Sequence, residues 1–215
     1  MTIRHHIPPR LIRAYVAGSL PASFATVVAA HVSLCDECRA RLAAEELAAG
    51  AILDSLEPAP APEGDAGLRE RLLARLDQSP ELPDEAPPER MGIYPGPVAQ
   101  ALKGRPPRWK RLGGGIRQAI LAQDAEGSAR LLYIPPGTAV PDHSHGGLEL
   151  TMVLQGSFSD ETGHYGVGDV EVADESLEHT PVAGPEAPCI CLAATDAPLR
   201  FRSLVPRLLQ PLFRI

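Results

Sequence analysis

The chain has 215 residues and a mass of 22.9 kDa, which is enough for one large or two small domains. Its net charge is −7, and residues 1–85 and 109–215 each carry 13 acidic against 8 basic side chains. Two acidic regions argue against direct binding of nucleic acid, and they suit a partner with a basic surface, such as a DNA-binding protein.

The cysteines and the apolar segments indicate an intracellular protein. Four cysteines fall in two close pairs, which is unlike the disulfide framework of a secreted domain. The first residues run into prolines and do not form the apolar core of a signal peptide. No apolar stretch is long enough to span a bilayer, so we expect a cytoplasmic protein without a membrane partner.

Three helices are predicted in the first third of the chain. Residues 8–19 have prolines at the first turn and apolar residues at helical spacing. A longer helix is predicted from Pro21 to about Ala49, with Gly50 as its stop. Residues 67–77 form a third, amphipathic helix. Residues 1–78 are therefore expected to form a small helical domain, whose marginal core would benefit from a bound metal ion.

A set of potential metal ligands lies in the middle of the longer helix. His31, Cys35 and Cys38 are spaced i, i+4 and i+7, which puts them on one face of a helix. With a fourth ligand they can bind a tetrahedral zinc ion. His6 is the candidate, and its neighbour His5 could replace it. The same face carries core residues, so a buried histidine with two buried thiols, or a redox pair, stays an alternative.

The rest of the chain reads as a linker followed by a β domain. Residues 79–108 are rich in proline and are predicted to be a semi-rigid linker. Residues 109–215 contain short apolar runs bounded by Gly, Pro or Asp, which are typical of a sandwich or a small barrel. The predicted strands are Arg117–Ala122, Arg130–Ile134, Glu149–Leu154, Asp169–Ala173, Cys189–Thr195 and Leu199–Leu204. The predicted fold class is multi-domain, α then β.

A second set of metal ligands lies in the β region. The stretch from Gly137 to Gly156 reads G-x5-H-x-H-x3-E-x6-G and contains His143, His145 and Glu149. It resembles the first motif of the cupin superfamily at every defined position, which implies a cupin β-barrel, or jelly roll. A strand directs two histidines two residues apart to the same face, as a shared metal ion requires.

The second cupin motif is degraded. The glycines and aspartate of Gly166–Asp169 remain, and His179 is the best match for the histidine of this motif. His164 precedes the turn and would be misplaced. Three imidazoles and one carboxylate can close a tetrahedral zinc site, or they can hold iron or manganese with two open positions. The spacing does not separate these metals.

Cys189 and Cys191 alternate with apolar residues on a predicted strand, so both thiols face the same side. Residues two apart on one strand are poorly placed for an unstrained disulfide. We interpret the pair as two small buried side chains, with a redox-sensing role as the alternative.

The two halves together, His-x24-His-x3-Cys-x2-Cys followed by a cupin, resemble the ChrR family of zinc anti-sigma factors. The likeness extends to Ala194–Phe201 near the end of the chain. It implies a helical domain that binds a group IV (extracytoplasmic-function) sigma factor and blocks its binding to polymerase and promoter. It also implies that the cupin serves an oxidative stress response, to singlet oxygen or organic hydroperoxide, and not inhibition itself.

The resemblance also assigns the metal ligands and a regulatory role without catalytic residues. The ligands of the N-terminal zinc would be His6, His31, Cys35 and Cys38, and those of the cupin metal would be His143, His145, Glu149 and His179. An alternative from another class is a metal-dependent cupin enzyme, a dioxygenase or isomerase, with a helical assembly module. A third reading, metal storage or zinc sensing, would require weak and exchangeable binding.

Overall fold

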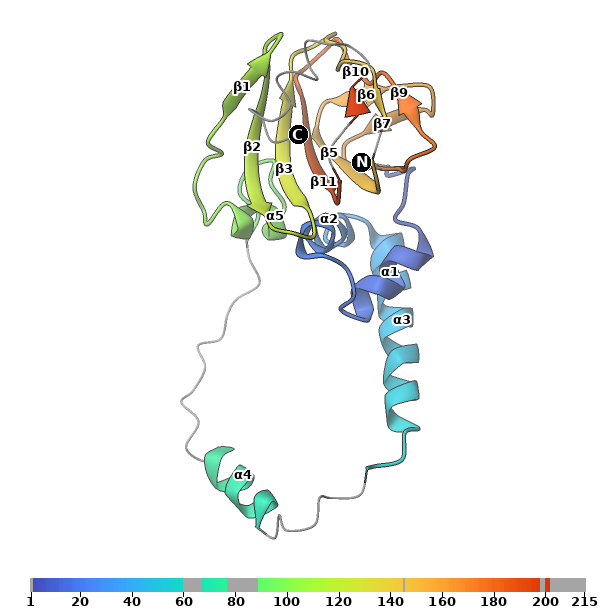
Figure 1. The fold of residues 1–215 in the computed structure, drawn as a ribbon, viewed down its shortest axis with the longest axis vertical. Coiled ribbons are helices and arrows are strands. Elements are labelled where there is room, and N and C mark those ends of the chain that lie inside the picture. Colours follow the sequence, from blue (N-terminus) through green and yellow to red (C-terminus); the bar gives the residue numbers. More distant parts are fainter. Residues whose placement is uncertain (1, 60–66, 77–88, 145, 198–199, 202–215) are drawn as a thin grey trace.

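The structure is a computed structural model that describes residues 2–59, 67–76, 89–144, 146–197 and 200–201. Helices come first along the chain and strands follow, as predicted (Figure 1). The helices are α1 (Pro9–Val16), α2 (Ala22–Val32), α3 (Asp36–Asp54), α4 (Leu68–Leu76) and α5 (Gly96–Ala101).

The prediction of one continuous helix from Pro21 to about Ala49 is wrong. Helix α2 ends at Val32, and α3 begins at Asp36 after a short turn. Cys35 is extended, with φ −105° and ψ 107°, and its Sγ accepts a hydrogen bond of 3.4 Å from the backbone N–H of Cys38. The sulfur therefore caps α3, and Asp36 and Glu37 add favourable negative charge to its first turn.

The strands form one large sheet and two small ones, with antiparallel pairing throughout the described register. The large sheet has the order β1-β2-β3-β11-β5-β8, and the small sheets are β10-β6-β7 and β12-β4-β9. The bounds are β1 (Lys110–Gly113), β2 (Ile116–Gln123), β3 (Ser128–Ile134), β4 (His143–Ser144), β5 (Glu149–Gln155), β6 (Ser157–Ser159), β7 (His164–Gly166), β8 (Val170–Ala173), β9 (Glu178–His179), β10 (Val182–Ala183), β11 (Cys189–Thr195) and β12 (Arg200–Phe201).

Five of the six predicted strands are found within a residue or two of their predicted ends, as β2, β3, β5, β8 and β11. Of the sixth, Leu199–Leu204, only β12 lies among the described residues. Strands β5 and β11 are buried on both faces, which explains their nearly continuous apolar sequence. One face lines the interior of the barrel, and the other is covered by α2.

Helix α2 belongs to the cores of both halves of the molecule. It packs on β3, β5 and β11 on one side and on α1 and α3 on the other (Figure 1). Its apolar side chains join a core with those of the sheet, including Phe24, Val27, Val28, Leu150, Met152 and Leu192. The predicted linker, 79–108, also contributes, since α5 packs against α2 and buries Val98. The helices and the sheet therefore share one hydrophobic core.

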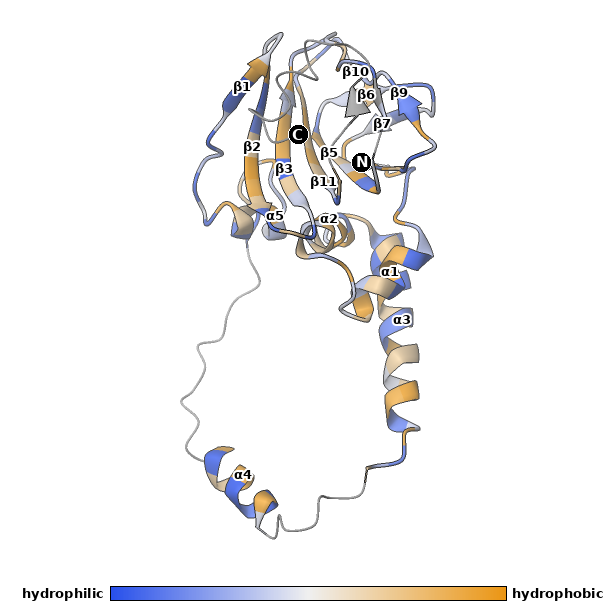
Figure 2. Ribbon diagram, viewed as in Figure 1, coloured by the Kyte–Doolittle hydropathy of each residue, from blue (hydrophilic) through white to orange (hydrophobic). Residues whose placement is uncertain are grey.

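Two helical segments leave apolar side chains in water. The second half of α3 exposes Leu47, Ile52 and Leu53, and α4 exposes four leucines. Figure 1 shows α4 apart from the other elements, and Figure 2 shows the apolar residues on both segments. None of the helices in the described ranges combines the length and apolarity that a bilayer crossing requires.

Candidate metal centres

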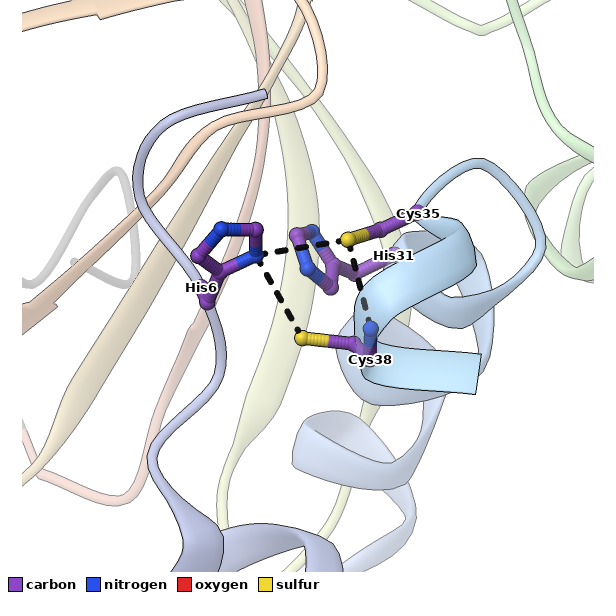
Figure 3. Close-up of side chains that lie close together, drawn as sticks. All are labelled: His6, His31, Cys35 and Cys38. Carbon is purple, nitrogen blue, oxygen red and sulfur yellow. Dashed lines mark hydrogen bonds between the residues drawn. The ribbon is translucent and has the colours of Figure 1, made fainter. Parts of the chain in front are cut away.

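The four predicted N-terminal ligands converge on one point (Figure 3). One ligand atom from each of His6, His31, Cys35 and Cys38 lies within 4.8 Å of the others. His6 precedes α1, His31 is in the last turn of α2, and the two cysteines flank the start of α3. The turn between α2 and α3 is what brings the thiols back to the imidazoles.

The hydrogen bonding of His31 identifies its ligand atom. Nδ1 lies 2.9 Å from the carbonyl oxygen of Gly168, and because a carbonyl can only accept, Nδ1 carries the proton. Burial lowers the pKa of His31 to about 4, so the ring is neutral at pH 7. Nε2 is buried and has no hydrogen-bond partner. A buried nitrogen lone pair without a partner fits a metal ligand.

His6 offers the opposite nitrogen. Its Nδ1 lies 3.3 Å from Sγ of Cys35 and 3.6 Å from Sγ of Cys38, and its Nε2 lies 3.2 Å from a carboxylate oxygen of Glu37. The Glu37 carboxylate thus orients the ring for binding through Nδ1. The alternative ligand, His5, instead packs on Tyr165 with ring centroids 4.4 Å apart.

Both thiols are buried, and without a metal ion burial raises the pKa of Cys38 to about 11. A metal ion must therefore displace the proton when it binds. Two nitrogens and two sulfurs from four protein side chains form a closed, tetrahedral type of donor set, which fits structural zinc. The side chains of this site can hold such an ion without further ligands.

Glu37 was missed by the sequence reasoning, although its place between two ligating cysteines in a helix first turn was a usable signal. We expect Glu37→Gln to weaken zinc binding by about tenfold, because the carboxylate that orients His6 is lost. Competition with a chromophoric chelator measures this. Glu46→Gln, at an exposed position of the same helix, is the control, and equal affinities for the two variants would contradict the role of Glu37.

The second predicted site is described in part. Glu149 and His179 are buried and line one cavity of about 70 Å³ inside the barrel. His143 on β4 is paired directly with His179 on β9. The side chain of His143 and all of His145 lie outside the described residues. His164, the weaker candidate, is exposed and bonds to Ser159 at 2.8 Å.

Two carboxylates beside His179 were not predicted. Nδ1 of His179 lies 2.6 Å from Asp160 Oδ2 and 3.3 Å from Glu171 Oε1. Burial lowers the pKa of His179, but the hydrogen bonds and charges of Glu171 and Asp160 outweigh it and raise the pKa to about 9. Burial raises the pKa of Glu171 to about 7. Because Nδ1 is engaged by carboxylates, a metal ion would bind His179 through Nε2.

Cys189 and Cys191 lie side by side in the interior of the barrel, with their Sγ atoms 3.4 Å apart and both thiols free and buried. A hydrogen bond that the Cys191 thiol donates to Cys189, together with burial, holds the pKa of Cys191 well above its usual range. The protonated form is the less reactive one. Their burial agrees with the interpretation as two small buried side chains, and a redox-sensing role stays the alternative.

Comparison with known proteins tests the resemblance. The family model of the ChrR cupin-like domain matches residues 102–198. The anti-sigma-E factor ChrR of Cereibacter sphaeroides is 52% identical over 218 residues, and the alignment covers the whole of both chains. This chain belongs to the ChrR family of anti-sigma factors. Full-length coverage means that the likeness spans both the helical part and the cupin-like part of the chain.

A solved structure of a ChrR protein extends the likeness to three dimensions. The crystal structure of Rhodobacter sphaeroides SigE in complex with the anti-sigma ChrR matches with a TM-score of 0.77 and 49% identity. The match covers 91% of this chain and 100% of that one. The predicted family and the predicted fold class, helices followed by a cupin-like β domain, are thereby confirmed.

Proposed function

We propose that this ChrR-family chain is a zinc-dependent anti-sigma factor that sequesters a group IV (extracytoplasmic-function) sigma factor. The observation that carries the proposal is the match, over nearly the whole chain, to a ChrR protein in complex with SigE. The convergence of His6, His31, Cys35 and Cys38 supports a zinc ion in the helical part. The bound sigma factor is thereby kept from polymerase and promoter.

The exposed apolar residues supply the docking surface. Leu47 and Leu53 of α3 are 77% and 71% exposed, and the leucines of α4 are also open to solvent. Clustered exposed leucines mark a protein-interaction surface more often than a solvated face. The acidic character of residues 1–85 complements a basic DNA-binding partner. Cys35 caps α3 and Cys38 lies in its first turn, so the bound ion fixes where α3 begins.

The cupin is proposed to hold a second metal ion through His143, His145, Glu149 and His179. The shared cavity of Glu149 and His179 and the pairing of His143 with His179 support it. Zinc is the proposed ion, and iron or manganese would fit an enzyme. We propose that this domain serves the release of the sigma factor under oxidative stress, from singlet oxygen or organic hydroperoxide.

Co-expression with candidate group IV sigma factors, followed by pull-down and metal counting, tests the proposal. We expect an equimolar complex with two zinc ions per chain. Failure to retain any group IV sigma factor would overturn the anti-sigma function. Iron or manganese in the purified chain, with turnover of a small substrate, would favour the metal-dependent dioxygenase or isomerase.

We expect a chain without residues 109–215 to keep its inhibition but lose induction by oxidant. The proposed zinc ligands and the exposed leucines all precede residue 77, so the docking surface remains. Removal of the sheet uncovers Phe24 and Val27 of α2, so the fragment should be co-expressed with the sigma factor. Sigma-factor affinity within about tenfold of the intact chain supports this, and loss of binding contradicts it.

A further inference from the structure

A turn of the cupin reaches the N-terminal metal centre. The carbonyl of Gly168 accepts the hydrogen bond from Nδ1 of His31 at 2.9 Å. The carboxylate oxygen Oδ1 of Asp169 accepts backbone N–H groups from Arg4 at 2.6 Å and from His5 at 2.9 Å. These contacts join residues more than 130 positions apart in the chain, and Asp169 is only 4% exposed.

The turn itself is rigid. Oδ2 of Asp169 accepts the N–H of Gly166 at 2.8 Å, and the N–H of Asp169 bonds back to the Gly166 carbonyl at 2.9 Å. Gly168 has a φ of +91°, which glycine adopts at little cost. Next in the chain, Val170 donates its N–H to the carbonyl of His5 at 3.2 Å.

These bonds fix two of the four ligands from outside the helical part. His6 directly follows the two residues whose N–H groups Asp169 binds. The carboxylate therefore fixes the backbone from which the His6 side chain extends. The Gly168 carbonyl holds the proton of His31 on Nδ1 and leaves Nε2 for the metal ion. Such partners of metal ligands orient the ligands and raise metal affinity.

We infer that the Gly166–Asp169 turn of the cupin orients two ligands of the N-terminal metal centre, His6 and His31. Asp169 acts in it as a positioning residue. The docking of the cupin thus sets how firmly the helical part holds its ion. The inference rests on the proposed function in one respect, that the four ligands bind a metal ion.

Strand β8, which begins directly after the turn, also borders the interior of the barrel. Glu171, two residues beyond Asp169, lines the cavity and lies 3.3 Å from Nδ1 of His179. Asp169 directly precedes Val170, the first residue of β8 (Val170–Ala173). A shift of β8 caused by a change in the cavity would therefore also move the carboxylate that holds Arg4 and His5.

The test measures metal release from the full-length chain loaded with Co²⁺. Of the two proposed sites, only the N-terminal one has thiolates, so the thiolate-to-cobalt charge-transfer band reports that site alone. On addition of a chelator, we expect the band of Asp169→Asn to decay about tenfold faster than that of the wild type. Asp124→Asn is the matched control, because Asp124 Oδ1 also accepts two backbone N–H groups, but in the turn between β2 and β3.

A second variant covers the case in which Asp169→Asn does not fold, as judged by circular dichroism. His5→Ala removes the ring contact with Tyr165 and leaves the backbone of residue 5 intact. We expect His5→Ala to speed the release of Co²⁺ as well, but by a smaller factor than Asp169→Asn. If the folded variants release Co²⁺ at the wild-type rate, the inference is overturned. The same holds if Asp124→Asn speeds the release as much as Asp169→Asn does. If the variants release Co²⁺ faster but the wild-type chain binds no sigma factor, the inference stands and only the proposed function is overturned.

Discussion

Replacement of Cys38 by serine is expected to empty the N-terminal metal centre and to weaken sigma-factor binding by about two orders of magnitude or more. Cys38 is in the first turn of α3 and its Sγ lies 3.6 Å from Nδ1 of His6. A serine hydroxyl is a poor zinc ligand at neutral pH, and three ligands leave the ion open to water. Without the ion, the coordinate link between His6 and the start of α3 is lost, and the packing of α1 on α3 has to hold the N-terminal segment by itself.

The variant is checked by zinc content and by titration with the sigma factor. Cys189→Ser is the control, since it removes one buried thiol from the barrel and leaves the four N-terminal ligands in place. We expect the control to keep its N-terminal ion and its affinity. Full zinc content or unchanged affinity for the Cys38 variant would show that the ion is not what organises the docking surface.

The double substitution Leu47→Asp and Leu53→Asp is expected to reduce sigma-factor affinity by about a hundredfold or more. Burial of a leucine in an interface contributes about 1.5–3 kcal/mol, and an aspartate there adds a desolvation cost. Both side chains are over two-thirds exposed, so the free chain loses little packing. Its thermal stability and zinc content should therefore stay close to those of the wild type.

Calorimetry or a competition assay with polymerase measures the effect. Ile120→Asp and Val182→Asp are matched controls, because these side chains are apolar, 40% exposed and located on the cupin. They should leave the affinity unchanged. If the controls weaken binding as much as the α3 variant, the docking surface is on the cupin and the proposed division of roles is wrong.

Part of the site could be derived from short-range spacing. Cys35 and Cys38 are three residues apart, and His31 is four residues before Cys35, so helical structure, with or without the tight turn before Asp36, keeps the three close. The cupin motif likewise fixes ligand types by spacing within one segment. The choice of His6 over His5 agrees with the geometry, in which His5 packs on Tyr165. The helix break at Cys35 was missed because apolar periodicity continues across it.

The amino-acid sequence by itself determined the order of helices and strands, the ligand types and the family resemblance, since these depend on local periodicity and spacing. Only the tertiary structure decided that α2 is shared by both halves, that Asp160 and Glu171 engage His179, and that Gly168 and Asp169 reach the N-terminal ligands. Those contacts join residues from 8 to 165 positions apart, and it is the burial of apolar faces against each other that selects them.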